Sequence, residues 1–296
     1  HGIKAHEHKL VPLQTRSERP RSTSISDFAE LSNRQEIWRY LPMDRLQGLD
    51  AEVIGEVSRD ELSITLAGTA TANGIDSSEP IVGTAGLAED RISAIAWTNA
   101  SKTLLVEVPA DQEIAEPVFL TLKLEELAAK ALHIFVKVGA NAKATIVLDH
   151  IGQGSLAENV EILLEPGAKL DFVSIQDWDN GSSHVSNQLT RLGKDAVLKH
   201  VVVSLGGDLV RVTPSVALDS PGAEIQMYGV YLADSKNYFE HRPYVDHIAE
   251  NCRGQVAPTI LWISQSEELQ EQAWKFFSQV WQVPPIRASE EADHCG

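Results

Sequence analysis

A turn motif that returns at a nearly constant spacing constrains the fold of this chain more than any other feature of its sequence. Each copy has a turn, usually with glycine, then an alanine, and then a run in which apolar and polar residues alternate. The alanines are Ala142, Ala168, Ala196 and Ala223, at spacings of 26, 28 and 27 residues. A weaker copy has its alanine at Ala115, 27 residues before Ala142. A recurring period in this range is typical of repeat architectures.

Each repeat is made of strand and turn, and a single repeat cannot bury its own apolar face. Stacked repeats close a continuous core, with each unit contacting its neighbours. The sequence therefore predicts a mainly β fold, a right-handed parallel β-helix (β-solenoid) whose core covers residues 51–254. We expect the small alanine after each turn to let the corner of the coil pack tightly. A β-sandwich or jelly roll is the competing interpretation, but sandwich strands do not usually repeat one turn motif at constant spacing.

Two segments precede the predicted core. Residues 1–24 are polar and predict a flexible N-terminal arm. Residues 25–50 predict a helical segment in short pieces, with Trp38, Leu41 and Leu46 as its apolar anchors.

Residues 255–296 form an atypical tail, because the repeat stops after Arg253. A capping-box pattern at residues 264–267 precedes apolar residues at helical spacing, which predicts a short amphipathic helix that ends at Pro284. These apolar residues are Leu269, Ala273, Trp274, Phe277, Val280 and Trp281. A truncated or out-of-frame terminus is the alternative interpretation.

Local patterns add four predictions in the first half of the core. Residues 63–66, 92–97 and 103–108 are rich in Val, Ile, Leu and Thr and predict strands. Residues 125–131 predict a short helical or loop insertion.

Charge and hydropathy exclude several classes of function. The formal net charge of −17 disfavours binding to a phosphate backbone, and we expect no nucleic-acid partner. The one basic concentration is Arg16, Arg19 and Arg21, which we interpret as part of a solvated arm. No stretch has the roughly 18 apolar residues that a membrane span needs, and the first 25 residues lack the apolar core of a signal peptide. We expect a cytoplasmic protein with no membrane partner.

One constellation carries metal chemistry. His241, Asp246, His247 and Cys252 lie within twelve residues, and iron or iron–sulfur clusters favour thiolate, with imidazole and carboxylate as accompanying ligands. Adjacent strand residues point to opposite faces, so Asp246 and His247 cannot both face one site. The structural alternative is a corner in which Asp246 caps a turn, His247 is a surface residue and Cys252 is a small core residue.

Other polar residues are weaker candidates. His150, His184 and His200 are scattered at predicted strand ends, and we expect them to be structural. Asp177 and Asp179 could serve a β-helix polysaccharide hydrolase or lyase, but both flank Trp178 just before Asn-Gly, which is turn chemistry. No Gly-x-Ser-x-Gly elbow is present.

Two local motifs resemble the SufB/SufD family of iron–sulfur cluster assembly proteins, and the SufD type in particular. The first is Asp27-Phe28 followed by Asn-Arg-Gln-Glu-Ile-Trp-Arg-Tyr-Leu-Pro at residues 33–42. The second is His-Arg-Pro-Tyr-Val-Asp-His at residues 241–247 followed by Asn-Cys-Arg at residues 251–253. The resemblance covers roughly residues 20–254.

The resemblance implies a scaffold subunit that is not itself an enzyme. Such subunits pair with a SufB-type subunit and dock a SufC-type ABC ATPase, and the complex builds iron–sulfur clusters that it holds transiently. ATP would be bound by the SufC-type partner, and this chain has no Gly-x-x-x-x-Gly-Lys-(Ser/Thr) phosphate loop. The family continues with further coils after the point matched by Arg253, so none of its cluster-forming residues is carried over. The polysaccharide enzyme and a purely structural β-solenoid remain the alternatives.

Overall fold

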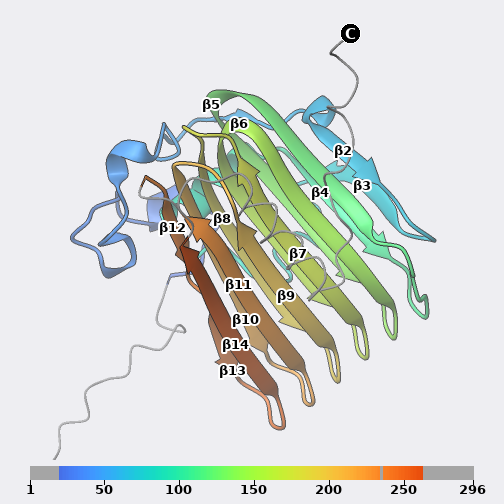
Figure 1. Ribbon diagram of the computed structural model, residues 1–296. Helices are drawn as coiled ribbons and strands as arrows, with labels where there is room; N and C mark the ends of the chain where they lie inside the picture. Colours follow the sequence, from blue (N-terminus) through green and yellow to red (C-terminus); the bar gives the residue numbers. More distant parts are fainter. Residues whose placement is uncertain (1–19, 234–235, 263–296) are drawn as a thin grey trace, which may run out of the picture.

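The structure is a computed structural model, and it describes residues 20–233 and 236–262. A stack of long, mostly parallel strands forms the body of the molecule (Figure 1). These strands are β4 (Lys102–Val108), β5 (Val118–Val138), β6 (Lys143–Leu164), β7 (Lys169–Trp178), β8 (Ser183–Leu192), β9 (Val197–Ser204), β10 (Leu209–Leu218), β11 (Glu224–Ala233), β12 (Tyr238–His241), β13 (Tyr244–His247) and β14 (Arg253–Trp262).

The strands make two faces of a solenoid. We call the first halves of β5 and β6 together with β7, β9, β11 and β14 the first sheet, in which each strand pairs with the next in parallel. The second sheet contains β4, the second halves of β5 and β6, and then β8, β10, β12 and β13. The chain passes from one sheet to the other in every coil. The prediction of a parallel β-solenoid is therefore confirmed, while its right-handedness stays a prediction.

The corners explain the period of the sequence. The residue before each corner alanine has a positive φ, at Asn141, Gly167, Asp195 and Gly222. All four alanines are fully buried, as expected from their small size. A side chain at Gly222 would meet Asp195 Oδ1 at 2.0 Å, so stacked turns alternate glycine with a short polar residue.

The weaker copy at Ala115 was assigned to the wrong residue. Ala115 is exposed, and Ile114 is the buried residue beside it. The bridge between Glu113 and Lys143 shows that this first turn is built differently from the later ones.

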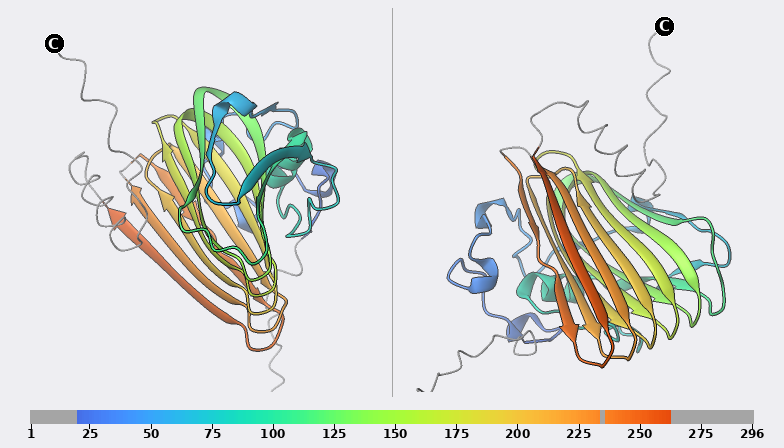
Figure 2. Two further views of the ribbon diagram at one scale, coloured as in Figure 1. Left: turned by 90° about the vertical axis from the view of Figure 1, so that its right-hand side faces the viewer. Right: turned by 60° about the horizontal axis from the view of Figure 1, so that its bottom comes forward.

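Short helices of the N-terminal region cover the outer side of the second sheet (Figure 2). They are η2 (Ile25–Asp27), η3 (Glu36–Trp38), η4 (Met43–Arg45) and α1 (Arg91–Asn99). The remaining elements of this region lie along the first coils, where η5 (Arg59–Glu61) follows the first of three short strands that pair with β5 or β4, namely β1 (Gly55–Glu56), β2 (Leu62–Thr65) and β3 (Thr71–Asp76). Trp38, Leu41 and Leu46 are buried in one cluster with Val185 and Leu209 of the second sheet, which confirms the three predicted anchors.

Two local predictions were wrong. Residues 92–97 belong to the helix α1, whose N-cap Asp90 accepts a hydrogen bond from the backbone N–H of Ser93. An apolar run that is buried on every side looks the same in a strand and in a helix. Residues 125–131 continue β5 past a register shift between Glu126 and Ala129, rather than forming an insertion. Strands β2 and β4 confirm the other two predicted strands.

The boundaries of the core also differ from those expected. Strand β14 stays in register with β11 as far as the pair Ala233 and Trp262, so the coils pass the expected limit at residue 254. At the other end, residues 20–24 are held against the body of the protein. Arg21 forms ion pairs with Glu89 and Asp246, and the backbone N–H of Ser22 donates to the carbonyl of Ala88. The tail helix expected after residue 264 lies outside the described residues.

Candidate functional site

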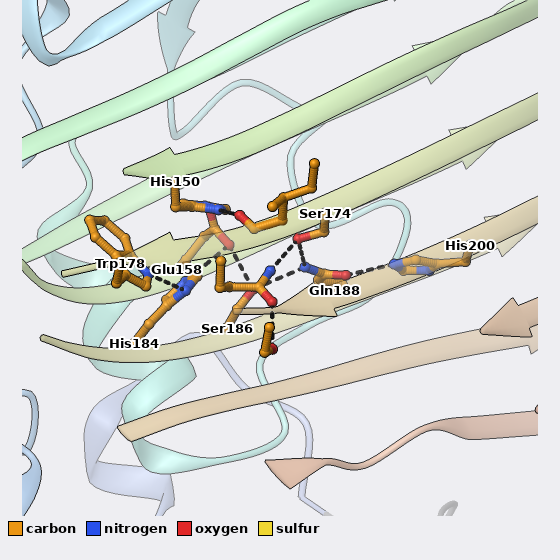
Figure 3. Close-up of polar contacts among 11 residues, drawn as sticks. His150, Glu158, Ser174, Trp178, His184, Ser186, Gln188 and His200 are labelled. Carbon is orange, nitrogen blue, oxygen red and sulfur yellow. Dashed lines mark hydrogen bonds and ion pairs between the residues drawn. The ribbon is translucent and has the colours of Figure 1, made fainter. Parts of the chain in front are cut away.

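A connected set of polar side chains occupies the interior of the solenoid, and we call it the interior network (Figure 3). It lies beside the main apolar core, on strand positions that alternate with outward-facing residues. Apart from the less buried His241, every member is at most 3% exposed. The members are His150, Glu158, Ser174, Gln176, Trp178, His184, Ser186, Gln188, His200, Ser204 and His241.

Glu158 is the charged centre of the interior network. Its Oε1 lies 2.9 Å from His150 Nε2, and its Oε2 accepts a hydrogen bond from Ser186 Oγ at 2.7 Å. Burial alone would raise the pKa of Glu158, but the charge and hydrogen bond of His150 outweigh it and hold this pKa well below its usual range. Burial would likewise lower the pKa of His150, yet the Glu158 carboxylate raises it. The two residues therefore form a buried imidazolium–carboxylate pair.

His184 is held in its neutral form with the proton on Nε2. Trp178 Nε1 donates a hydrogen bond to His184 Nδ1 at 3.2 Å, so Nδ1 must carry a lone pair. The protonated Nε2 then faces Glu158 Oε2 at 3.4 Å. Burial and the positive charge of His150 lower the pKa of His184, and the Glu158 carboxylate opposes these effects only in part.

Amides and hydroxyls extend the network toward β9. Ser174 Oγ accepts hydrogen bonds from Gln176 Nε2 at 2.7 Å and from Gln188 Nε2 at 3.0 Å. Gln188 Oε1 accepts from His200 Nε2 at 2.6 Å. Burial lowers the pKa of His200 to about 3, so this ring is neutral.

The last link reaches the end of β12. Ser204 Oγ donates to Gln176 Oε1 at 2.9 Å, which uses its single proton, so His241 Nε2 must donate to Ser204 Oγ at 2.9 Å. Burial, together with the neighbouring imidazole of His200, lowers the pKa of His241 to about 3. The interior network thus holds one charged pair and three neutral imidazoles across consecutive coils.

His150, Glu158 and His184 also have the composition of a metal site. Their ligand atoms lie within 4.8 Å of one another, and two imidazoles with one carboxylate suit iron(II). His150 fits this role, because its Nδ1 donates to the carbonyl of Ile175 at 2.7 Å and this would leave Nε2 for a metal. His184 does not fit, because the hydrogen bond from Trp178 keeps the proton on the nitrogen that would have to ligate. The arrangement therefore suits the holding of a proton and not of a metal ion.

In the part of the chain that the structure describes, the four residues predicted as metal ligands do not bring their ligand atoms together as a metal site would require. His241 belongs to the interior network. Asp246 pairs with Arg21 at 3.4 Å, and His247 is exposed at the end of β13. Metal binding by these four residues stays a prediction.

Cys252 occupies the place of a corner alanine. Asn251 before it has a φ of 60°, as Asn141 has before Ala142, and Cys252 packs against the main apolar core. Its Sγ donates to the carbonyl of Ser220 at 3.3 Å. This geometry agrees with the structural alternative in which the cysteine is a small core residue.

The two sequence motifs that carried the resemblance meet in space. Arg242, from the second motif, donates to the carbonyl of Ile37, from the first, at 2.8 Å. Arg211 donates to the same carbonyl at 2.8 Å, and its guanidinium lies 4.1 Å from the centre of the Trp38 ring. The motifs therefore fasten the N-terminal segment to the last coils.

Sequence reasoning missed the interior network. It placed His150, His184 and His200 at strand ends, whereas all three point into the solenoid and are at most 1% exposed. The repeat spacing could have indicated the network. Glu158 and Ser186 are 28 residues apart, and so are Gln176 and Ser204, which places the two members of each pair one coil apart. Stepping along the sequence by one coil would have aligned these polar positions.

The fold and the interior network define a parallel β-solenoid protein with a buried polar network beside its apolar core, and comparisons give its family. A family model described as "SUF system FeS cluster assembly, SufBD core domain" matches residues 121–266. An iron–sulfur cluster assembly SufBD family protein of Mycobacterium tuberculosis is 33% identical over 236 residues, which are 79% of this chain and 59% of that relative. One of Mycobacterium leprae is 32% identical over 237 residues, which are 79% of this chain and 60% of that relative.

The chain belongs to the SufB/SufD family of iron–sulfur cluster assembly proteins. It spans about three fifths of the length of the curated relatives that it matches. The family does not favour the alternative of a polysaccharide hydrolase or lyase. No helix in the described ranges is long and apolar enough to cross a membrane.

Proposed function

We propose that this chain is a SufD-type scaffold subunit that acts with a SufB-type subunit and a SufC-type ABC ATPase. In this proposal the iron–sulfur cluster is cargo of the complex, and ATP is bound by the SufC-type partner. The chain contributes a rigid stack of coils and no catalytic group of its own. The observation that carries the proposal is the match of the SufBD core domain to the coils themselves, together with a polar interior whose members hydrogen-bond one another.

The end of the coil stack is the surface that we assign to a partner. Among the described strands, β14 pairs on one side only, with β11. Its Val256 is 45% exposed although its partner Met227 is buried, as expected for a core position that awaits a further layer. An unpaired strand edge with an apolar neighbour is a ready template for strand addition by another chain.

Co-expression of the intact chain with SufB-type and SufC-type subunits tests the proposal. We expect the three to co-purify, with iron and sulfide in the eluate. Val256→Arg should weaken the complex, whereas Val53→Arg should leave it intact, because Val53 is 84% exposed in the segment that leads to β1 beside the first coils. Failure of the unmodified chain to retain either partner would refute the proposal.

A further inference from the structure

Two imidazole nitrogens of the interior network have no hydrogen-bond partner among the described residues. They are Nδ1 of His200 and Nδ1 of His241, and both atoms are buried. Each ring donates a hydrogen bond from its other nitrogen, Nε2, to Gln188 Oε1 at 2.6 Å and to Ser204 Oγ at 2.9 Å respectively. Both rings are neutral, because burial lowers the pKa of each to about 3. Each Nδ1 therefore carries a lone pair in the interior that no described residue uses.

Both rings lie against the same part of β11. His200 on β9 is the register partner of Met227 on β11, so the two residues are neighbours on the inner face of the first sheet, at a strand spacing of about 4.8 Å. Gly229 is two residues further along β11 and faces the same side. A Cβ at Gly229 would lie 2.8 Å from His241 Nδ1, so this nitrogen lies over β11, one inward-facing position away from Met227. Glycine at residue 229 leaves the space that the imidazole of His241 occupies.

Met227 adds a third uncharged donor between the two rings. Its side chain is 3% exposed, and its three rotatable bonds allow the sulfur to adapt its position. Thioether ligands select copper(I), and imidazole also binds copper. The surroundings are apolar, since the ring of Phe172 packs edge-on against His200 at 5.3 Å and Met227 belongs to the main apolar core. The cost of burying an ion rises steeply with its charge, so uncharged donors in such a place favour a monovalent ion over a divalent one.

We propose that His200 Nδ1, His241 Nδ1 and the thioether of Met227 bind one copper(I) ion in the last coils of the solenoid. The hydrogen bonds that the two Nε2 atoms donate would fix the tautomer and orientation of the rings, as they do for histidines that ligate metals. His184 is excluded from such a role, because Trp178 donates a hydrogen bond to its Nδ1. The inference does not rest on the proposed function, in which copper has no part.

The position of the site gives an ion a short way in. Met227 pairs with Val256 of β14, the last described strand of the first sheet, and Val256 is 45% exposed. One layer of side chains therefore separates the site from solvent on this side. Of the four ligands predicted from the sequence, His241 alone takes part in this site.

X-ray absorption spectroscopy of the full chain with one equivalent of copper(I), in the absence of oxygen, gives the first test. Cys252→Ser and Cys295→Ser remove both thiols, after which the sulfur atoms of the chain are those of Met43 and Met227. We expect nitrogen and sulfur neighbours at copper. Met227→Leu nearly conserves side-chain volume and should remove the sulfur neighbour, whereas Met43→Leu should leave it in place. Copper without a sulfur neighbour, or loss of sulfur in Met43→Leu, would overturn the proposal.

Competition with a coloured copper(I) chelator gives the second test, in the same chain without cysteines. His200→Gln, His241→Gln and Met227→Leu should each weaken binding by at least about tenfold, because loss of a ligand should cost no less than loss of a hydrogen bond that orients one. His247→Gln changes an exposed histidine at the end of β13 and should alter the affinity less than about twofold. Circular dichroism verifies that each variant is folded. Equal affinities in the starting chain and the three ligand variants would place copper elsewhere and refute the site.

Discussion

Two buried histidine–glutamate pairs use glutamates that lie on opposite faces of the second sheet. His150 and Glu158 face the interior, at 2.9 Å, while His133 and Glu161 face outward beneath the N-terminal cover, at 3.0 Å. All four side chains are at most 1% exposed. The pairs differ in what completes the hydrogen bonding of the carboxylate.

Backbone N–H groups complete the hydrogen bonding of the Glu161 carboxylate. It accepts hydrogen bonds from the N–H groups of Gly83 and Ala85, and His133 also contacts the ring of Trp97 in α1. The outer pair therefore fastens a loop and a helix to the second sheet. Glu158 is completed by side chains from other strands, so the inner pair depends on correct stacking of the coils.

Removal of the inner carboxylate should have the largest effect on stability. Glu158→Ala leaves the His150 imidazolium buried without its partner, and loss of one member of a buried ion pair costs about 3–5 kcal/mol. Urea unfolding at pH 7 measures the change. Glu125→Ala is the control, because that glutamate side chain is 77% exposed, and it should be nearly neutral. A loss below about 1 kcal/mol for Glu158→Ala would show that the inner pair is not charged.

Substitution of the outer carboxylate should cost less and act locally. Glu161→Gln keeps one acceptor oxygen but turns an amide NH₂ toward a backbone donor, at Gly83 or Ala85, and an unsatisfied buried donor costs about 1–3 kcal/mol. Hydrogen exchange should become faster in residues 83–99 and stay unchanged in β7 and β9. Glu158→Gln should give the reverse pattern. Identical patterns for the two variants would remove the distinction between the pairs.

The features of the fold that repeat could be predicted from the sequence. The corner alanines follow from the period because each coil needs a small residue after a turn with positive φ. Trp38 could be singled out as an anchor because a tryptophan in a polar stretch needs a place to be buried. Helix α1 could not be told from a strand, because it is buried on the sides that would have shown a helical period.

The interior network depends on distance relations that a single sequence does not contain. His150 and His184 come from different sheets, and the sequence does not indicate that both rings reach Glu158. The charge of His150 follows from its contact with the Glu158 carboxylate, whereas the neutrality of His184 follows from its burial and from the hydrogen bond that Trp178 donates to it. The four predicted ligands clustered in sequence, but strand alternation and the corner at Cys252 keep them apart.

Acid titration should separate the neutral imidazoles from the charged pair. His200 has a pKa of about 3 in the folded protein and about 6.5 when unfolded, so below pH 6.5 the unfolded chain takes up a proton that the folded protein refuses. As the pH falls below 6.5, this residue therefore lowers the free energy of unfolding by about 1.4 kcal/mol per pH unit. The loss is about 2 kcal/mol between pH 6.5 and pH 5. His200→Gln keeps a donor toward Gln188 and should remove that part of the acid loss.

His150 should titrate with the opposite sign. Its pKa is raised, so its contribution to stability is fully present below the unfolded value of 6.5 and is lost as the pH rises through the folded pKa. His150→Gln should therefore lessen the alkaline loss and leave the acid loss due to His200 in place. Urea unfolding across pH 4–9 measures both variants, and matching pH profiles would contradict the assignment of one charged and one neutral ring.

The smallest expected effect concerns the single hydrogen bond that keeps metal out of the inner pair. Trp178→Phe removes the donor to His184 Nδ1 at a cost of about 0.5–1.5 kcal/mol beyond lost packing. The proton of His184 can then move to Nδ1, which frees Nε2 to bind zinc together with His150 and Glu158. ¹⁵N NMR of the imidazoles should show this tautomer change, and Zn²⁺ should raise the Tm of the variant.

Trp97→Phe is the control at the outer pair, where the tryptophan contacts His133 through its ring. Neither this variant nor the unmodified chain should show a higher Tm with Zn²⁺. If His184 keeps its proton on Nε2 in Trp178→Phe, the carboxylate of Glu158 alone sets the tautomer. The hydrogen bond from the indole would then not be the reason that this group holds a proton and not a metal ion.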